Sequence, residues 1–389
     1  MRIVLVGPAY PLRGGIAQYN TSLARAFEAA GDEVLVISYA RQYPGIFFPG
    51  KSQQDGGGEA FRIEAEHLVD SVNPFNWPKV ADRISGFKPD LVLFQWWQPF
   101  FAPSFRGIVR ALKKALPVPV IFLCHNLLSH ESSSFPGRKI IEKVLAKTGF
   151  HVADGFMVHS DQLRKDLALY ARGKPAAGIF HPLYDFYKEW DMAPPGEKKR
   201  DGDDKELKIL YFGKIRRYKG LEVLIDALGR IDAGIPFKAV FAGECYLPRE
   251  NFRQKIESLG LSDRISWEDR YIPNQEIPVL FRSADVVVLP YLRASQSGVI
   301  PVAYQFEVPV IVSDVGGLSE VVKQNVTGFL VQPGDPAALA EAITRFYNLH
   351  SREYLREGIR SIRKQFTWES VVNSAKRLHL DILKQRNNE

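Results

Sequence analysis

Two lysines flanked by glycines stand where an apolar run gives way to a helical one. The stretch "YFGKIRRYKGLEVLIDAL" places Gly213-Lys214 at the end of the first and Lys219-Gly220 at the start of the second. Glycine allows close approach of a backbone to a ligand, and two ammonium groups at the end of a strand can converge on an anion. An ordinary solvated basic loop is the alternative. The pattern favours an anion site with Lys214 and Lys219 as its cations.

A second glycine pair, Gly14-Gly15, lies between the first strand and an amphipathic run. Free N–H groups at the start of a helix favour negative charge, so this loop also predicts contact with a phosphate; a plain strand-to-helix turn is the alternative. A dinucleotide site would prefer three spaced glycines and an acid ending the second strand, which here ends in Ser38-Tyr39. The pattern therefore disfavours NAD.

A small polar turn precedes the apolar run that begins at Val299. It consists of Ser295, Gln296, Ser297 and Gly298. These residues offer hydroxyl, amide and backbone donors at the start of a covered helix, which is typical of an anion-binding turn.

Further polar and aromatic residues stand at strand exits in the first half. His125 is placed to hydrogen-bond a substrate hydroxyl or to carry a proton, although a structural histidine fits the position equally well. Trp96 and Trp97 suit carbohydrate stacking or lipid contact, and core packing is the alternative. Asn126 and the two tryptophans are therefore candidate contacts of a carbohydrate or lipid substrate, separate from the anion sites described above.

The net charge of +7 is concentrated in residues 101–174, which hold 12 Lys or Arg against 5 Asp or Glu. This excess indicates a surface facing a polyanion, an anionic membrane or an acidic substrate. Within it, "RKIIEKVLAK" at 138–147 has aliphatic residues on one side of a helix and lysines on another. That pattern fits an interfacial membrane helix, with an ordinary surface helix as the alternative.

The cysteines, the lengths of the apolar segments and one acidic run indicate the cellular compartment and whether a metal site is expected. Cys124 and Cys245 each end an apolar run and predict reduced thiols of a cytosolic protein. The chain enters a strand at once and has no apolar segment long enough to cross a bilayer, so we expect a cytoplasmic protein, with attachment at the inner membrane surface left open. The acidic run at 201–204 lacks histidine and glutamate and predicts a solvated spacer, so no metal site is expected.

Apolar runs alternate with helical stretches, which predicts an α/β fold with parallel sheets covered on both faces. The segment 188–206, rich in Pro, Gly and charge, separates two such series. We therefore expect Rossmann-like domains at 1–187 and 207–367, facing each other across a cleft that is the default ligand site. The helix at 368–389 is expected to cross back to the first domain. The strands predicted are 2–7, 33–39, 90–95, 118–124 and 155–159 in the first domain, and 208–212, 238–242, 265–267, 285–289, 309–312 and 328–331 in the second.

The chain resembles the family 4 glycosyltransferases of the GT-B fold over almost its whole length. The resemblance implies a nucleotide sugar of the UDP- or GDP-sugar class held mainly by the second domain, and an acceptor held mainly by the first. It further implies transfer with retention of configuration and with neither metal nor cofactor. The matching motifs are the Gly14-Gly15 loop, "CHN" at Cys124, "HPLYD" at His181, "YFGKIRRYKG", "FAGE" ending at Glu244, "RSADVVVLPY", "SDVGGLSEVV", "NVTGFLVQPGDPAALAEAI" and "FTWESVV".

Carried over by motif, the resemblance implies that Lys214 and Lys219 neutralise the leaving diphosphate and that His125 lies by the reacting sugar. The family usually has arginine at position 214. Further donor contacts would come from Gly14, Gly15, Gly213, Gly243 and Glu244, from Ser295, Gln296, Ser297 and Gly298 at the diphosphate and sugar, and from Tyr271 and Ile272 at the nucleobase.

The chain departs from the family at two positions. The family commonly carries two glutamates eight residues apart, and these positions fall on Ala294 and Val302. Either this branch binds the sugar with the 295–298 turn and holds the ribose otherwise, or the chain is an inactive nucleotide-sugar-binding protein. A sugar-nucleotide epimerase of the same architecture is a third possibility. The expected partners are a nucleotide sugar, a carbohydrate or lipid-linked acceptor and an anionic membrane surface, but no nucleic acid.

Overall fold

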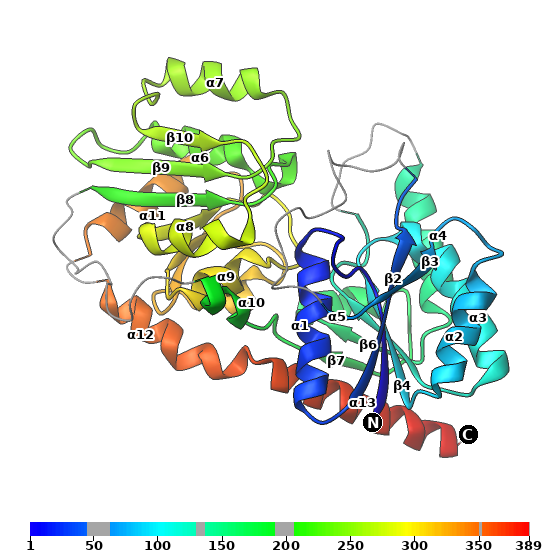
Figure 1. Cartoon of the computed structure of the whole chain (residues 1–389). Coiled ribbons are helices and arrows are strands. Elements are labelled where there is room, and N and C mark those ends of the chain that lie inside the picture. Colours follow the sequence, from blue (N-terminus) through cyan, green and yellow to red (C-terminus); the bar gives the residue numbers. More distant parts are fainter. Residues whose placement is uncertain (45–62, 130–136, 191–205, 350–351, 389) are drawn as a thin grey trace. The chain divides into compact units, whose positions relative to one another are not determined.

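The computed structural model describes residues 1–44, 63–129, 137–190, 206–349 and 352–388, and it divides into two compact units (Figure 1). Unit 1 comprises Met1–Phe180 with Thr367–Glu389, and unit 2 comprises His181–Phe366. The final helix therefore belongs to the first unit. Most of the expected linker, with the acidic run at 201–204, lies outside the described residues.

Unit 1 is built around a seven-stranded, fully parallel sheet in the order β3-β2-β1-β4-β5-β6-β7. Its strands are β1 (Arg2–Val6), β2 (Glu33–Arg41), β3 (Glu66–Asp70), β4 (Leu91–Trp96), β5 (Val120–Cys124), β6 (Gly155–Val158) and β7 (Ala176–Gly178). Its helices are α1 (Gly15–Ala29), α2 (Trp77–Phe87), α3 (Ala102–Ala115), α4 (Arg138–Phe150), α5 (Asp161–Leu167) and α13 (Trp368–Asn388).

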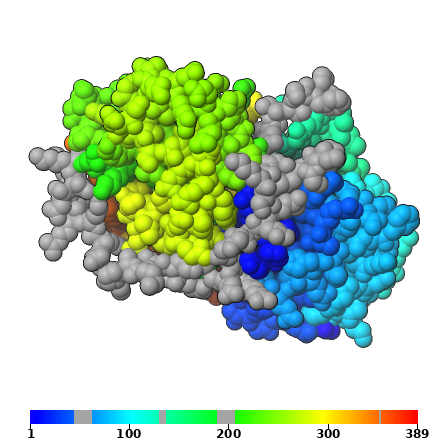
Figure 2. Space-filling model, turned by 45° about the horizontal axis from the view of Figure 1, so that its top comes forward, coloured from blue at the N-terminus to red at the C-terminus, as the bar shows by residue number. Residues whose placement is uncertain are grey.

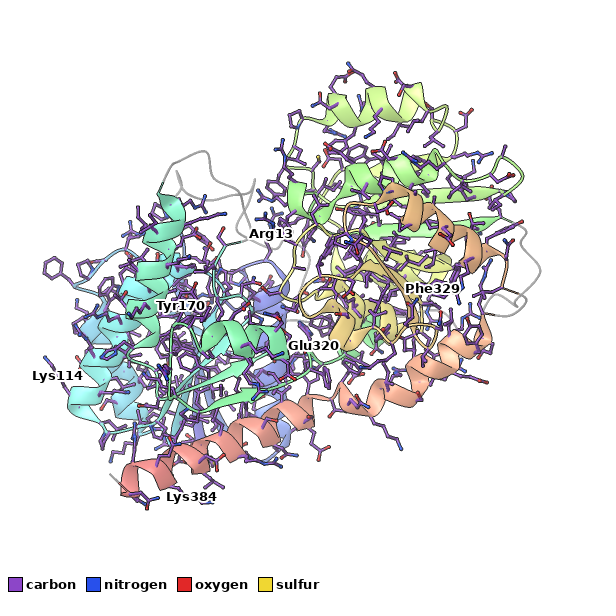
Figure 3. All side chains as sticks on the ribbon, turned by 180° about the vertical axis from the view of Figure 1, so that it is seen from behind. Arg13, Lys114, Tyr170, Glu320, Phe329 and Lys384 are labelled. Carbon is purple, nitrogen blue, oxygen red and sulfur yellow. The ribbon has the colours of Figure 1, made fainter. Side chains whose placement is uncertain are left out.

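Alternation along the strands divides the core of unit 1 between the two faces of the sheet. Val4 and Val6 of β1 pack with the helices α2, α3, α4 and α5, whereas Ile3 and Leu5 pack with α1 and α13. Both faces are apolar because both are covered, as in other parallel sheets. Lys114 and Lys384, near the ends of α3 and α13, are exposed (Figure 3).

Unit 2 contains a six-stranded parallel sheet in the order β10-β9-β8-β11-β12-β13. Its strands are β8 (Leu207–Phe212), β9 (Phe237–Ala242), β10 (Ile265–Glu268), β11 (Val286–Leu289), β12 (Val310–Ser313) and β13 (Gly328–Val331). Its helices are α6 (Leu221–Leu228), α7 (Arg249–Ser258), α8 (Ile277–Ser283), α9 (Val299–Gln305), α10 (Leu318–Val321), α11 (Pro336–Tyr347) and α12 (Glu353–Ile362).

The predicted fold class is confirmed, since each predicted strand coincides with a strand of one of the two sheets. Sequence patterning missed β3 and β7, which lie at the two edges of the first sheet. Residues 181–187, placed with the first domain by the sequence analysis, lie in unit 2. The physical reason is that Tyr184 and Tyr187 are buried there, with Tyr187 against Phe306.

In the space-filling view, unit 1 contributes the blue to cyan surface and unit 2 the green to yellow one (Figure 2). Across the described residues, no helix is long and apolar enough to cross a membrane. Over the same ranges, no group of three or more His, Cys, Asp or Glu residues is arranged to hold a metal ion.

Candidate functional site

The clearest chemical feature of unit 2 is the ammonium group of Lys219. It ends a short 3-10 helix (Arg217–Lys219) that follows β8, and its Nζ lies 5.3 Å from the centroid of the Tyr291 ring. Burial lowers the pKa of Lys219, and the nearby Arg216 lowers it further, while Tyr218 acts in the opposite direction. No carboxylate of the described residues forms an ion pair with this ammonium. A desolvated cation of this kind favours an anionic ligand.

Two glycines allow the backbone to pass close to this cation. A Cβ on Gly213 would lie 3.1 Å from Lys219 Nζ, and Gly213 has a φ of 107° that suits only glycine. A Cβ on Gly243, at the exit of β9, would lie 2.2 Å from the Gly213 carbonyl oxygen. The ends of β8 and β9 therefore meet without side chains, and the predicted Gly213 and Gly243 lie together.

Tyr291 connects the lysine to the predicted polar turn. Its hydroxyl lies 3.5 Å from Ser297 Oγ, which in turn accepts the N–H of Val299 at 3.2 Å. Burial raises the pKa of Tyr291 to about 12, so the ring stays neutral beneath the ammonium. The structure thus brings Lys219 and Ser297 to one edge of the sheet, through a tyrosine that sequence reasoning did not select.

The turn at 294–298 is shaped by a second loop. Gly316 has a φ of 53°, and a Cβ there would lie 1.8 Å from the Ala294 carbonyl oxygen. The next residue, Gly317, donates its N–H to the Ser295 carbonyl oxygen at 3.1 Å. Within this turn, Gln296 Oε1 is buried and accepts no hydrogen bond from the described residues. An acceptor left in this state suits a ligand that brings its own donor.

The positions where the family places glutamates differ in their surroundings. Val302 is 4% exposed and belongs to the buried side of α9, whereas Ala294 is half-buried beside the Gly316 loop. Neither side chain offers a polar atom. Within the turn, Gln296 supplies the amide oxygen closest in kind to a carboxylate.

A buried pair that the sequence analysis did not select lies against the end of the turn. His181 Nδ1 is 3.1 Å from the Pro182 carbonyl oxygen, and its Nε2 is 3.1 Å from the Tyr184 hydroxyl. A Cβ on Gly298 would be 3.7 Å from that Nε2 and 3.8 Å from that hydroxyl. The only signal available beforehand was the "HPLYD" motif, which carries no chemistry by itself.

The other donor-side residues have varied surroundings. Lys214 is exposed, in contrast to Lys219. The buried Glu244 accepts a hydrogen bond from the Tyr246 hydroxyl at 2.8 Å. Tyr271 is half-buried, while Ile272 is only 4% exposed and is a core residue.

In unit 1, His125 is held by a buried polar chain. Its Nε2 lies 2.8 Å from Gln95 Oε1, and Gln95 Nε2 donates to Asn20 Oδ1 at 3.0 Å. Asn20 Nδ2 donates in turn to the Pro8 carbonyl oxygen at 3.2 Å. His125 is only 3% exposed, so it is a fixed ring inside unit 1 and not a freely projecting one.

Two more rings, those of Tyr19 and His159, lie beside this histidine. The Tyr19 ring lies 4.9 Å from that of His125, 5.3 Å from that of His159 and 4.9 Å from that of Trp368. Trp368 begins α13, so this helix packs on Tyr19, which in turn lies against His125. Sequence reasoning missed Tyr19 and His159, although His159 also follows a strand.

The two tryptophans predicted to contact an acceptor have different surroundings. Trp96 has no exposed surface, donates its Nε1–H to the Leu127 carbonyl oxygen at 3.3 Å and packs on Phe150. It is a core residue, so the suggested contact with an acceptor is wrong for this side chain. Trp97 is half-buried, with its Nε1 3.1 Å from the Tyr43 hydroxyl, and Asn126 is half-buried as well.

The first glycine loop has open surroundings. Gly14 is the N-cap of α1 with a φ of 119°, and a Cβ on either Gly14 or Gly15 would meet no atom of the described residues within 4 Å. The loop can therefore admit another group close to the first N–H groups of a fifteen-residue helix.

Two family profiles match the chain in succession. The profile described as "Glycosyltransferase Family 4" matches residues 13–176, and that described as "Glycosyl transferases group 1" matches residues 206–348. Between them they cover the glycine loop, His125, Lys219 and the 295–298 turn.

Curated relatives match parts of the chain. An uncharacterized glycosyltransferase of Methanocaldococcus jannaschii is 27% identical over 191 residues, which are 49% of this chain and 48% of the relative. A D-inositol 3-phosphate glycosyltransferase of Geodermatophilus obscurus is 28% identical over 284 residues, 66% of this chain and 60% of the relative. The chain thus spans about half to three-fifths of the length of these two relatives.

Solved structures match the whole chain. HepE from Anabaena in complex with UDP superposes with a TM-score of 0.68 at 18% identity, covering 100% of both chains. Its complex with UDP-glucose gives 0.68 at 17% identity and the same coverage. At these identities the likeness shows the fold alone.

Proposed function

Because the chain belongs to the family 4 glycosyltransferases of the GT-B fold, we propose that it transfers a sugar from a nucleotide sugar to a carbohydrate or lipid-linked acceptor, with retention of configuration. The curated relatives include enzymes named for glycosyl transfer, and HepE has been solved with UDP and UDP-glucose. A donor of the UDP- or GDP-sugar class is the corresponding substrate here.

The observation that carries this proposal is the Lys219 ammonium, partly buried against Gly213 and Tyr291 without a carboxylate partner among the described residues. Glycosyl transfer builds negative charge on the departing diphosphate. A fixed cation there stabilises the transition state more than the ground state. Lys219 takes this role, and Lys214 adds charge from the exposed side of the loop, so that no metal ion is required.

The polar turn at 295–298 would bind the sugar or ribose in place of the two glutamates that the family usually carries. Gln296 Oε1 lacks a donor among the described residues and would accept a sugar or ribose hydroxyl, while the backbone N–H groups of Ser297 and Gly298 would bind the diphosphate. The Ser297 hydroxyl oxygen is already engaged by Val299, so it orients the turn. Glu244 and the Gly213–Gly243 contact complete the donor side, and Tyr271 contacts the base.

In unit 1, the proposed acceptor side includes His125, Asn126 and Trp97, with Gly14-Gly15 near the diphosphate. The hydrogen bond from His125 to Gln95 fixes the orientation of the ring. A histidine held in this way can hydrogen-bond a sugar hydroxyl without the entropic cost of ordering a free side chain.

Donor binding is tested first, by thermal unfolding of the full chain with UDP, GDP and their sugars. A ligand present at 100 times its Kd should stabilise the chain by about 2.7 kcal/mol. We expect stabilisation by one nucleotide class, and a weaker effect in a Lys219→Ala variant. Absence of any shift with all of these ligands would overturn the proposal.

Transfer is tested with the stabilising donor and a panel of carbohydrate and lipid-linked acceptors. NMR of the product should show the anomeric configuration of the donor, and a chelator should leave the rate unchanged. Donor binding without transfer or hydrolysis would instead identify an inactive nucleotide-sugar-binding protein. Release of a new nucleotide sugar without acceptor would identify an epimerase.

A further inference from the structure

Helix α4 carries an unusual surface for a helix of this chain. Ile140, Ile141 and Val144 are 69%, 53% and 56% exposed. Single exposed aliphatic side chains are normal in folded proteins, but three within two turns of one helix are not. No other helix in the described part of the chain carries more than one exposed large hydrophobic residue. The apolar face of α4 therefore needs an explanation of its own.

The packing of α4 explains why this face stays outside. Only Ala146, Gly149 and Phe150, near its C-terminal end, are buried. Gly149 is required there because a Cβ would lie 2.8 Å from the Trp96 ring and 3.0 Å from the Ala102 side chain. The helix is thus anchored to the core by its last turn and a half, while the opposite side of its first turns faces solvent.

Lysines line one side of the exposed aliphatic residues. Lys139, Lys143 and Lys147 repeat at every fourth position and are all exposed. The one acid of the helix, Glu142, is paired with Arg138 at 2.9 Å. The outward side of α4 therefore presents aliphatic groups beside ammonium groups that form no ion pair with the described residues.

We propose that this surface, formed by Lys139, Ile140, Ile141, Lys143, Val144 and Lys147, docks on a bilayer rich in anionic lipid. Aliphatic side chains would enter the interface while lysine stems extend so that their ammonium groups reach the lipid phosphates. Protein interfaces favour aromatic residues, methionine and arginine and are depleted of lysine, which is the reverse of this composition. The proposal does not depend on the identity of the donor or acceptor.

The test is co-sedimentation of the full chain with vesicles of phosphatidylcholine alone or mixed with phosphatidylglycerol. Three variants are compared with the wild type: Ile140→Ser/Ile141→Ser/Val144→Ser, Lys139→Gln/Lys143→Gln/Lys147→Gln, and the control Val279→Ser/Leu380→Ser. The control removes two aliphatic side chains that are 70% and 55% exposed on α8 and α13. Circular dichroism confirms that each variant is folded.

We expect the wild type and the control to bind the phosphatidylglycerol vesicles and to bind phosphatidylcholine weakly. Each lysine near an anionic surface contributes about fivefold in binding, so the lysine variant should bind roughly 100-fold more weakly. The aliphatic variant should lose on the order of tenfold or more. Equal binding by all variants, or no binding by the wild type, would overturn the proposal. So would a dimer in light scattering that the aliphatic variant abolishes, because a second copy would then be the occupant.

Discussion

The hydroxyl of Tyr184 donates a hydrogen bond to Nε2 of His181 across 3.1 Å. The direction follows from the other ring nitrogen, since Nδ1 faces the Pro182 carbonyl oxygen, which can only accept. Burial lowers the pKa of His181 to about 4, so the ring is neutral near pH 7, with its proton on Nδ1 and with Nε2 accepting. The Gly298 end of the polar turn rests on this uncharged pair.

The neutral state of His181 makes the stability of the chain depend on pH. Its folded pKa of about 4 lies below the value of 6.5 expected when unfolded, so the unfolded chain binds more protons between these values. Stability from this group is complete above about pH 6.5 and is lost as pH falls towards 4. Between pH 7.5 and 5 the wild type should lose roughly 2 kcal/mol more than His181→Gln, measured by urea unfolding. Parallel pH profiles for the two proteins would contradict the assignment.

Removing the Lys219 ammonium should separate activity from stability. Lys219→Ala should lower kcat by about 10² to 10³, equivalent to roughly 2.7 to 4 kcal/mol of transition-state stabilisation. Its thermal midpoint should be unchanged or higher, because a desolvated cation without a carboxylate among the described residues opposes folding in the absence of ligand. Lys364→Ala, an exposed lysine of the same unit, is the control and should match the wild type in both measurements. An unchanged kcat in Lys219→Ala would exclude the proposed role.

The contact between Gly316 and the polar turn gives a matched pair of glycine substitutions. Gly316→Ala and Gly334→Ala both place a side chain at positive φ, 53° and 73°, at a cost of about 1–2 kcal/mol each. Only at position 316 would the new Cβ strike backbone, 1.8 Å from the Ala294 carbonyl oxygen; at 334 its nearest neighbour is the Leu292 side chain at 3.6 Å. Calorimetry should therefore show weaker nucleotide-sugar binding by Gly316→Ala only. Equal affinities in the two variants would show that this loop does not shape the site.

The architecture was predictable because its signals are local. Each strand of the two sheet interiors is a short apolar run, and the glycine at 213 marks a place where chain segments approach closely. The edge strands β3 and β7 were not predicted because their local signals are weak. β3 mixes polar and apolar residues, and β7 is only three residues long.

Contacts between distant segments were not predictable. His125 meets Gln95 and Tyr19, which lie 30 and 106 positions away in the chain (125 − 95 and 125 − 19). Nothing in the local pattern around Trp96 distinguishes a buried ring from an exposed one, and the fold placed it against α4. Among the residues proposed to bind the nucleotide sugar, Lys219 was predicted from its motif. Tyr291 was recognised only because the structure places its ring close to the Lys219 ammonium.

The last helix should contribute strongly to the stability of unit 1. Ile382 is 3% exposed and packs against Gly155 at the start of β6, so Ile382→Ala should cost about 2–5 kcal/mol. Leu380→Ala, two positions away and 55% exposed, should change stability by less than about 0.5 kcal/mol. Urea unfolding measures both, and nucleotide binding by unit 2 should be the same in each. Similar losses in the two variants would mean that α13 is not anchored through Ile382.

The assignment of α13 to unit 1 has a consequence for how the chain is made. Residues 181–366 are contiguous, so unit 2 is complete as soon as they have left the ribosome. The sheet formed by residues 1–180 emerges earlier, yet the apolar face that receives Val371, Ala375 and Ile382 stays uncovered until residues 367–389 have been translated. During synthesis, unit 1 therefore begins to emerge before unit 2 but can be completed only after it.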